Sequence, residues 1–98
     1  MLYMLSWHIP HQNRNEVMQR FAASATDPLY AMPEGLRQVA RYHNISSLSG
    51  VMILESDDPA KVMGWSALWN DIMDFTLEPV IEDEAAGAIT AENLARLQ

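Results

Sequence analysis

Histidine and arginine side chains supply the first candidates for chemistry in this sequence. His8 lies near the end of one apolar run, and Arg41 and His43 lie two residues apart in a later segment. Imidazole exchanges protons near neutral pH, so His8 and His43 are candidate catalytic acids or bases. Arginine holds anionic groups through a fork of N–H donors, so Arg41 is a candidate ligand-binding residue. These residue types together favour binding of an anion combined with proton transfer.

The sequence does not predict a metal site. His8 and His11 have the spacing H-x-x-H, but Pro10 lies between them at the predicted end of a strand, so the two rings need not converge. No carboxylate lies at a fixed spacing from either ring, and the chain has no cysteine. A glycine-rich phosphate loop is also missing. We therefore expect no metal and no tightly bound cofactor.

The elements that must position these side chains include four predicted strands. They cover residues 2–9, 36–44, 51–56 and 75–82. The first strand is apolar along most of both of its rows, which is typical of a central strand covered on two faces. The last contains Pro79, which removes a ladder donor and predicts an edge strand or a bulge.

Two helices are predicted between the strands. Asn13 would cap the first helix, with Glu16 three residues later as in a capping box. Asp58 would cap the second helix, with Pro59 at its first position. Residues 26–35 contain two prolines and a glycine, and a loop of this length in a small domain is often a lid or a rim.

The order of these elements predicts an α+β fold of the ferredoxin-like βαββαβ type. Such a fold has an antiparallel four-stranded sheet with both helices on one face. We expect residues 1–82 to form this domain, and residues 83–98 to form a helical tail in which Thr90 caps a last short helix. Trp65 and Trp69 share one side of the second helix and are expected in the core.

Alternation along the strands assigns side chains to two faces of the sheet. The face toward the helices is predicted to carry Tyr3, Leu5, Trp7, Ile9, Ala40, Tyr42, Met52, Leu54, Phe75, Leu77 and Ile81. The opposite face is predicted to carry Met4, Ser6, His8, Val39, Arg41, His43, Val51, Ile53, Glu55, Thr76, Glu78 and Val80. A slip of one residue in any strand would move its whole row to the other face.

The second of these faces is half apolar and half ionisable. Such a mixture suits a small-molecule cavity enclosed between the sheets of a homodimer. The ligand-binding candidates on it are Ser6, His8, Arg41, His43, Glu55 and Glu78. In this arrangement Arg41 would pair with Glu55 or Glu78. The alternative is that these residues form ordinary ion pairs and rim contacts of the interface.

Composition limits the classes of partner. The chain has 98 residues, which is one domain, and 49% of them are hydrophobic, more than so small a domain can bury alone. This excess also favours a homodimer. The net charge of −7 argues against nucleic acid and against acidic membrane surfaces. The first residues lack the basic region of a signal peptide, and no segment is long enough to cross a membrane, so we expect a cytoplasmic protein.

Three segments carry a resemblance to a known family. They are E-S-D-D-P at Glu55–Pro59, W-S-A-L-W-N-D at Trp65–Asp71 and E-P-V-I-E-D at Glu78–Asp83. With them, the chain up to about Ala86 resembles a family of short, mostly bacterial proteins of unknown function with the dimeric α/β-barrel fold. The resemblance implies a fold and a dimer but no reaction.

Distant relatives with this barrel include cofactor-independent monooxygenases, haem-degrading enzymes and muconolactone isomerase-like proteins. The sequence lacks the Asn–Trp–His set of the haem-degrading branch, because Ser6 and His8 stand where an Asn would be needed. We expect a homodimer that binds a hydrophobic or aromatic metabolite, with a cofactor-independent oxygenase- or isomerase-like reaction as one option. The alternative is a non-catalytic interaction or assembly module whose acidic surface and tail recruit another protein.

Overall fold

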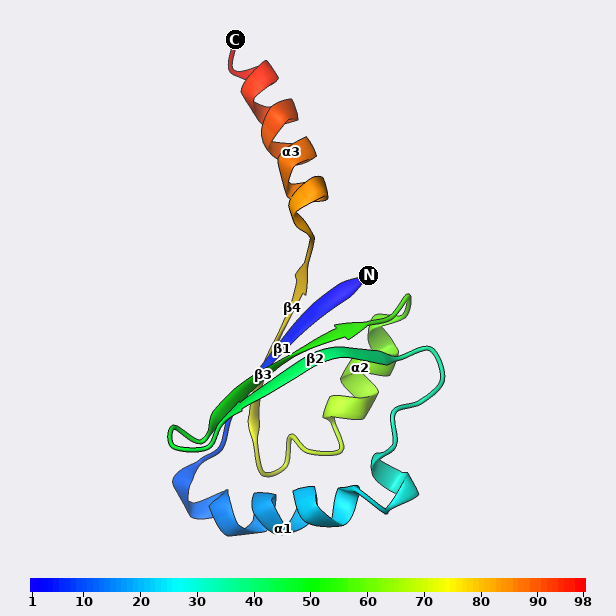
Figure 1. Ribbon diagram of the computed structural model, residues 1–98, viewed down its shortest axis with the longest axis vertical. Coiled ribbons are helices and arrows are strands. Elements are labelled where there is room, and N and C mark those ends of the chain that lie inside the picture. Colours follow the sequence, from blue (N-terminus) through cyan, green and yellow to red (C-terminus); the bar gives the residue numbers. More distant parts are fainter.

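The computed structural model describes residues 1–98 and has the predicted order of elements (Figure 1). Two short 3-10 turns, at His11–Asn13 and Pro28–Tyr30, flank the first helix. The helices and strands are β1 (Leu2–His8), α1 (Arg14–Ser24), β2 (Arg37–Asn44), β3 (Ser49–Glu55), α2 (Pro59–Ser66), β4 (Asp74–Val80) and α3 (Asp83–Arg96). The strands form one antiparallel sheet in the order β2-β3-β1-β4, as in a ferredoxin-like fold.

The positions of β1 and β4 in the sheet confirm two predictions from the sequence. β1 lies between β3 and β4 and is therefore central. β4 is an edge strand, and its Pro79 lies opposite Tyr3. An edge position tolerates proline because one side of the strand has no partner that requires its N–H.

The hydrophobic core lies between the sheet and the two helices α1 and α2. Leu5 of β1, Leu54 of β3 and Val62 of α2 are completely buried, and Val17 is the buried residue of α1. Trp69 is buried as predicted, while Trp65 is partly buried against the same cluster. This side of the sheet is called the helix face below, and the opposite side is called the open face.

The helix termini differ in part from the predictions. Asp58 caps α2, because its Oδ1 accepts a hydrogen bond of 2.9 Å from the Ala60 N–H, and Pro59 is the first helical residue. Asn13 makes no capping hydrogen bond with its side chain, so the predicted capping box is wrong. Thr90 caps nothing, because α3 already begins at Asp83 and the Thr90 hydroxyl donates to the Ala86 carbonyl within the helix.

A β-bulge in β2 makes the predicted faces of that strand wrong. Gln38 lies opposite Leu54, but Ala40 lies opposite Ile53, so one residue of β2, Val39, is extra. Every residue after the bulge therefore faces the side opposite to the one that simple alternation assigns. Arg41 and His43 lie on the helix face, and Ala40 and Tyr42 lie on the open face.

The other three strands have the predicted faces. Register pairs Met4 with Ile53 and Glu78, and Ser6 with Val51 and Thr76, all on the open face. Within a single chain no element covers this face, and its side chains are only partly buried.

The chain as a whole is extended. Its radius of gyration is 16.5 Å, whereas a compact domain of this length has about 12.6 Å. Figure 1 shows the main reason, since α3 continues past the end of the sheet and stands clear of the other elements. Every residue of α3 is exposed. None of the helices combines the length and the apolar character that crossing a membrane requires.

Candidate functional site

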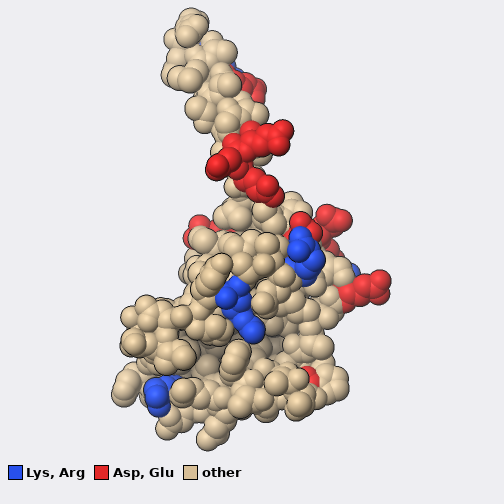
Figure 2. Space-filling view, viewed as in Figure 1, with Lys and Arg blue, Asp and Glu red and all other residues tan.

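The main cavity of the molecule lies between α1 and the helix face of the sheet. Its volume is about 610 Å³, and 15 of its 22 lining residues are hydrophobic. Figure 2 shows the surface hollowed between the sheet and α1. Both the volume and the mainly apolar wall are typical of sites for small organic molecules.

The hydrogen bonds of α1 go to the segment after α2, while its contact with β2 is through the Phe21 ring, so the space between helix and sheet is only partly filled. The Asn13 side-chain amide donates a hydrogen bond of 3.1 Å to the Ile72 carbonyl. The Arg20 guanidinium donates to both carboxylate oxygens of Asp71, at 2.8 and 3.0 Å, and to the Leu68 carbonyl at 3.0 Å. These contacts fix α1 at a distance from β2 and β3 and leave the intervening space partly open.

Apolar side chains of α1 form one wall of this space. Met18 and Phe21 line the cavity, and each is a little under half exposed. The sequence shows that α1 has an apolar side but not that this side is a cavity wall. Periodicity identifies the apolar side of a helix but does not say how far the helix stands from the sheet.

A second wall comes from the loop after α1 and the segment after α2. Tyr30 and Met32 line the cavity, as do Trp65 at the end of α2 and Trp69 after it. The Trp65 indole N–H donates to the Tyr30 carbonyl at 3.2 Å, and the Tyr30 and Trp69 rings lie with their centroids 5.3 Å apart. The long loop therefore forms part of the rim of the cavity, the second of the two roles predicted from its length.

Arg41 and His43 supply polar groups on the sheet side of the cavity. The Arg41 guanidinium lies 5.3 Å from the centre of the Phe21 ring. His43 packs edge to face between Trp7 and Phe21, with ring centroids 5.4 Å apart in both pairs. Partial burial of the ring, together with the nearby charge of Arg41, lowers the pKa of His43, although the residue as a whole stays exposed. His43 is therefore neutral at pH 7 and can accept a proton.

The charge of the cavity is opposite to that of the whole chain. Its lining includes Arg14 and Arg41 but no Asp or Glu, although the net charge is −7. Neither arginine forms an ion pair, whereas Arg20, Arg37 and Arg96 all do. Figure 2 shows that the acidic side chains gather mainly around the start of α3 and the nearby end of the sheet. Unpaired cations in an apolar hollow favour an anionic ligand.

The six ligand-binding candidates from the sequence do not form one site. Arg41 and His43 lie in the cavity on the helix face. The other four lie on the open face, namely Ser6, His8, Glu55 and Glu78. The predicted pairing of Arg41 with Glu55 or Glu78 is wrong, because the sheet separates them and Glu55 pairs with Arg37 at 3.1 Å.

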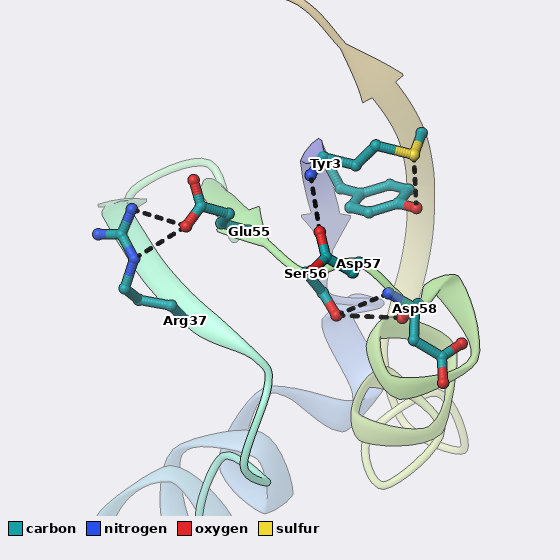
Figure 3. A network of polar contacts seen from close by, with 7 residues as sticks. Tyr3, Arg37, Glu55, Ser56, Asp57 and Asp58 are labelled. Carbon is teal, nitrogen blue, oxygen red and sulfur yellow. Dashed lines mark hydrogen bonds and ion pairs between the residues drawn. The ribbon is translucent and has the colours of Figure 1, made fainter.

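The E-S-D-D-P segment has a structural role that Figure 3 shows. Glu55 ends β3 in the ion pair with Arg37. The buried Ser56 hydroxyl accepts from the Asp58 N–H at 3.1 Å and donates to the Asp58 carbonyl at 3.2 Å. The carboxylate of Asp58 then caps α2. This segment turns the chain from the sheet into the helix, and none of its residues lines the cavity.

No group of three or more histidine, cysteine, aspartate or glutamate side chains is arranged to hold a metal ion. Polar residues that line the cavity but were not singled out from the sequence are Arg14, Ser24, Gln38, Asn44 and Ser49. The register explains Gln38, which lies opposite the buried Leu54, whereas Asn44 and Ser49 border the cavity where β2 turns into β3.

Comparison with known proteins identifies a family but no reaction. The structure of Rv0793 from Mycobacterium tuberculosis superimposes with a TM-score of 0.48 and 9% sequence identity, over 84% of this chain and 96% of that one. No curated protein matches the chain. The model of a domain of unknown function, DUF3303, matches residues 1–94. The match extends past Ala86, where the sequence resemblance was expected to end, and so includes nearly all of α3. The chain belongs to the DUF3303 family, whose function is unknown.

Proposed function

We propose that this protein binds a small anion with a hydrophobic body, such as an aromatic or aliphatic carboxylate, in the cavity between α1 and the sheet. The observation that carries the proposal is Arg41, an unpaired guanidinium at an apolar hollow that contains no carboxylate. A ligand carboxylate would take the place of the missing ion-pair partner. Hydrogen bonds between a guanidinium and a carboxylate are charge-assisted and among the strong ones in proteins.

The apolar wall supports a ligand with a hydrophobic body. The side chains of Trp7, Phe21, Trp65 and Trp69 give flat surfaces on three sides of the space. Burial of apolar ligand area on such surfaces contributes roughly 25 cal/mol per Å². An aromatic acid fits both requirements, with its ring among these side chains and its carboxylate at Arg41.

A reaction at this site would use His43 as the proton acceptor. The imidazole is neutral at pH 7 because burial and Arg41 lower its pKa. It lies beside the arginine that would hold the anion, which places a base near the bound molecule. An isomerase-like or cofactor-independent oxygenase-like reaction begins with such a proton abstraction.

The test compares two arginines of the same strand. Arg41→Gln removes the guanidinium of the cavity, and Arg37→Gln removes an exposed guanidinium that is paired with Glu55. A set of aromatic and aliphatic carboxylates, each with its neutral primary amide, is screened by thermal shift and then by calorimetry. We expect the carboxylates to bind the wild type and Arg37→Gln alike, and Arg41→Gln at least tenfold more weakly. Equal binding of acids and amides, or no binding by any acid, would refute the proposal.

We further propose that the protein works as a homodimer through its open face. The chain exposes 6809 Å², about 1,100 Å² more than a typical folded monomer of its mass. Part of that excess is the uncovered sheet, where Met4, Val51 and Ile53 lie beside Tyr42. Sedimentation at micromolar concentration tests the dimer, and a stable monomer there would contradict it.

A further inference from the structure

α3 is a helix that nothing in its own chain stabilises by packing. It has 14 residues, and all of them are exposed. Isolated helices of this length are marginal in water, and most helices in proteins depend on tertiary packing. Acidic residues in its first turn and the Glu92–Arg96 ion pair of 2.7 Å add only small local support. The helix therefore implies a partner surface.

One side of α3 carries an apolar stripe suited to packing. Its members lie on one side of the helix, with Asn93 among them, and they are Ala86, Ile89, Thr90 and Leu94, followed by Leu97 just past the end of the helix. The three large side chains among them are 51%, 57% and 82% exposed. The other side of the helix carries Ala88, Glu92 and Ala95.

We propose that α3 is an exchange arm, whose stripe packs on a second copy of this chain and extends the open-face interface. This inference rests on the homodimer proposed above and adds to it a specific contact. The occupant is a second copy because of the area involved. Four strands about 4.8 Å apart and seven residues long give a face of roughly 450 Å², whereas a stable interface uses about 800 Å² per partner.

The arm supplies the difference. A helix of 14 residues is about 21 Å long and about 10 Å wide, so it covers roughly 200 Å² on the partner. In a symmetric dimer each chain gives one arm and receives one, which raises the area per partner to roughly 850 Å². The area buried on the open face and on the arm is also most of the roughly 1,100 Å² by which the exposed surface of the single chain exceeds that of a typical monomer.

The arm is continuous with the open face. A shallow groove at the end of the sheet is lined by Leu2 and Val80 of the open face and by Ala85 of α3. Only Ile81 and Glu82 link β4 to α3, and Glu82 is extended, so the helix leads away from its own sheet (Figure 1). A second copy on the open face thus lies next to the base of the arm.

The experiment compares opposite sides of the arm in the full chain. Ile89→Glu with Leu94→Glu places two charges in the stripe, and Ala88→Glu with Ala95→Glu places two charges on the other side of the same helix. The dimer dissociation constant of each variant is measured by analytical ultracentrifugation. We expect the stripe variant to weaken the dimer at least 100-fold and the control variant to change it less than threefold. Equal effects of the two variants, or no effect of the stripe variant, would overturn the arm.

A third variant separates the arm from the dimer itself. Ile53→Glu places a charge in the open face, away from α3. If Ile53→Glu dissociates the dimer while the stripe variant does not, the dimer stands and the arm is wrong. If the wild type is monomeric, both are wrong. Amide hydrogen exchange of the wild type, measured at protein concentrations above and below the dimer dissociation constant, gives a second readout. If the α3 amides exchange equally fast at both concentrations, α3 does not pack on a second copy. A different protein would then be its partner.

Discussion

Gly50 offers a sharp test of how the cavity wall is built. It lies opposite both Trp7 and His43 in the sheet. A Cβ at this position would overlap the Trp7 ring at Cζ2 and would lie 2.6 Å from the Tyr42 carbonyl oxygen. The indole is nearly buried and packs against His43, and the carbonyl belongs to the sheet backbone, so neither can yield easily. Gly50→Ala is therefore expected to disturb both the sheet and the cavity.

The size of the effect follows from overpacking. Inserting a methyl group into a closely packed site costs about 1–3 kcal/mol, and here both a ring and a backbone oxygen are in conflict. We expect Gly50→Ala to lower the free energy of unfolding by about 3 kcal/mol, a large part of the roughly 5–15 kcal/mol typical of a domain. Displacement of Trp7 should also weaken carboxylate binding in the cavity.

Urea denaturation followed by tryptophan fluorescence measures the change. Gly64→Ala is the matched control, because Gly64 lies in α2 and an added Cβ there meets nothing within 4 Å. Alanine has the higher helix propensity, so this control should stabilise the protein by up to about 1 kcal/mol. If Gly50→Ala is as stable as the wild type, the close approach of Trp7 to the β3 backbone is wrong.

Two further predictions concern pH. The hydrogen bond from Arg20 lowers the pKa of Asp71. The stability that this pair contributes by joining α1 to the segment after α2 is therefore fully present above the unfolded pKa of 3.8. It is lost as the pH falls through the lower pKa of the folded state. Asp71→Asn should remove this part of the acid dependence in urea titrations, and an unchanged acid profile would contradict the link. Burial and Arg41 lower the pKa of His43 below 6.5, so stability should decrease as the pH falls below 6.5 toward that folded pKa, and His43→Gln should abolish the decrease. NMR titration of the His43 ring is the direct measurement, and a pKa at or above 6.5 would contradict the described packing.

Local patterns predict the order of elements and most of the sheet. The alternating rows of β1, β3 and β4, the edge position of Pro79 and the Asp58 cap all follow from rules that act within a few residues. The family resemblance agrees with the family match. These features are accessible because each depends on its own segment.

The candidate site was less accessible because it depends on contacts between distant segments. Asn13 has the sequence context of a helix cap, yet its side chain binds the Ile72 carbonyl, 59 residues away. The attachment of α1 through Arg20 and Asp71 opens the cavity, and nothing near either residue in the sequence indicates their pairing. The pattern of α1 therefore shows an apolar side without showing that this side borders an open space.

The bulge at Val39 decides on which face Arg41 and His43 lie, and it can be removed. Because Gln38 pairs with Leu54 and Ala40 with Ile53, deletion of Val39 would join two residues whose partners are already adjacent. The ladder would become regular while Arg41 stays opposite Met52, on the helix face. We therefore expect the deletion variant to keep the lowered His43 pKa and to bind carboxylates within about threefold of the wild type. If β2 were instead a regular strand in the wild type, the same deletion would move the residues after it, including Arg41 and His43, to the other face of the sheet. A large change in the His43 titration or in ligand binding would then contradict the bulge.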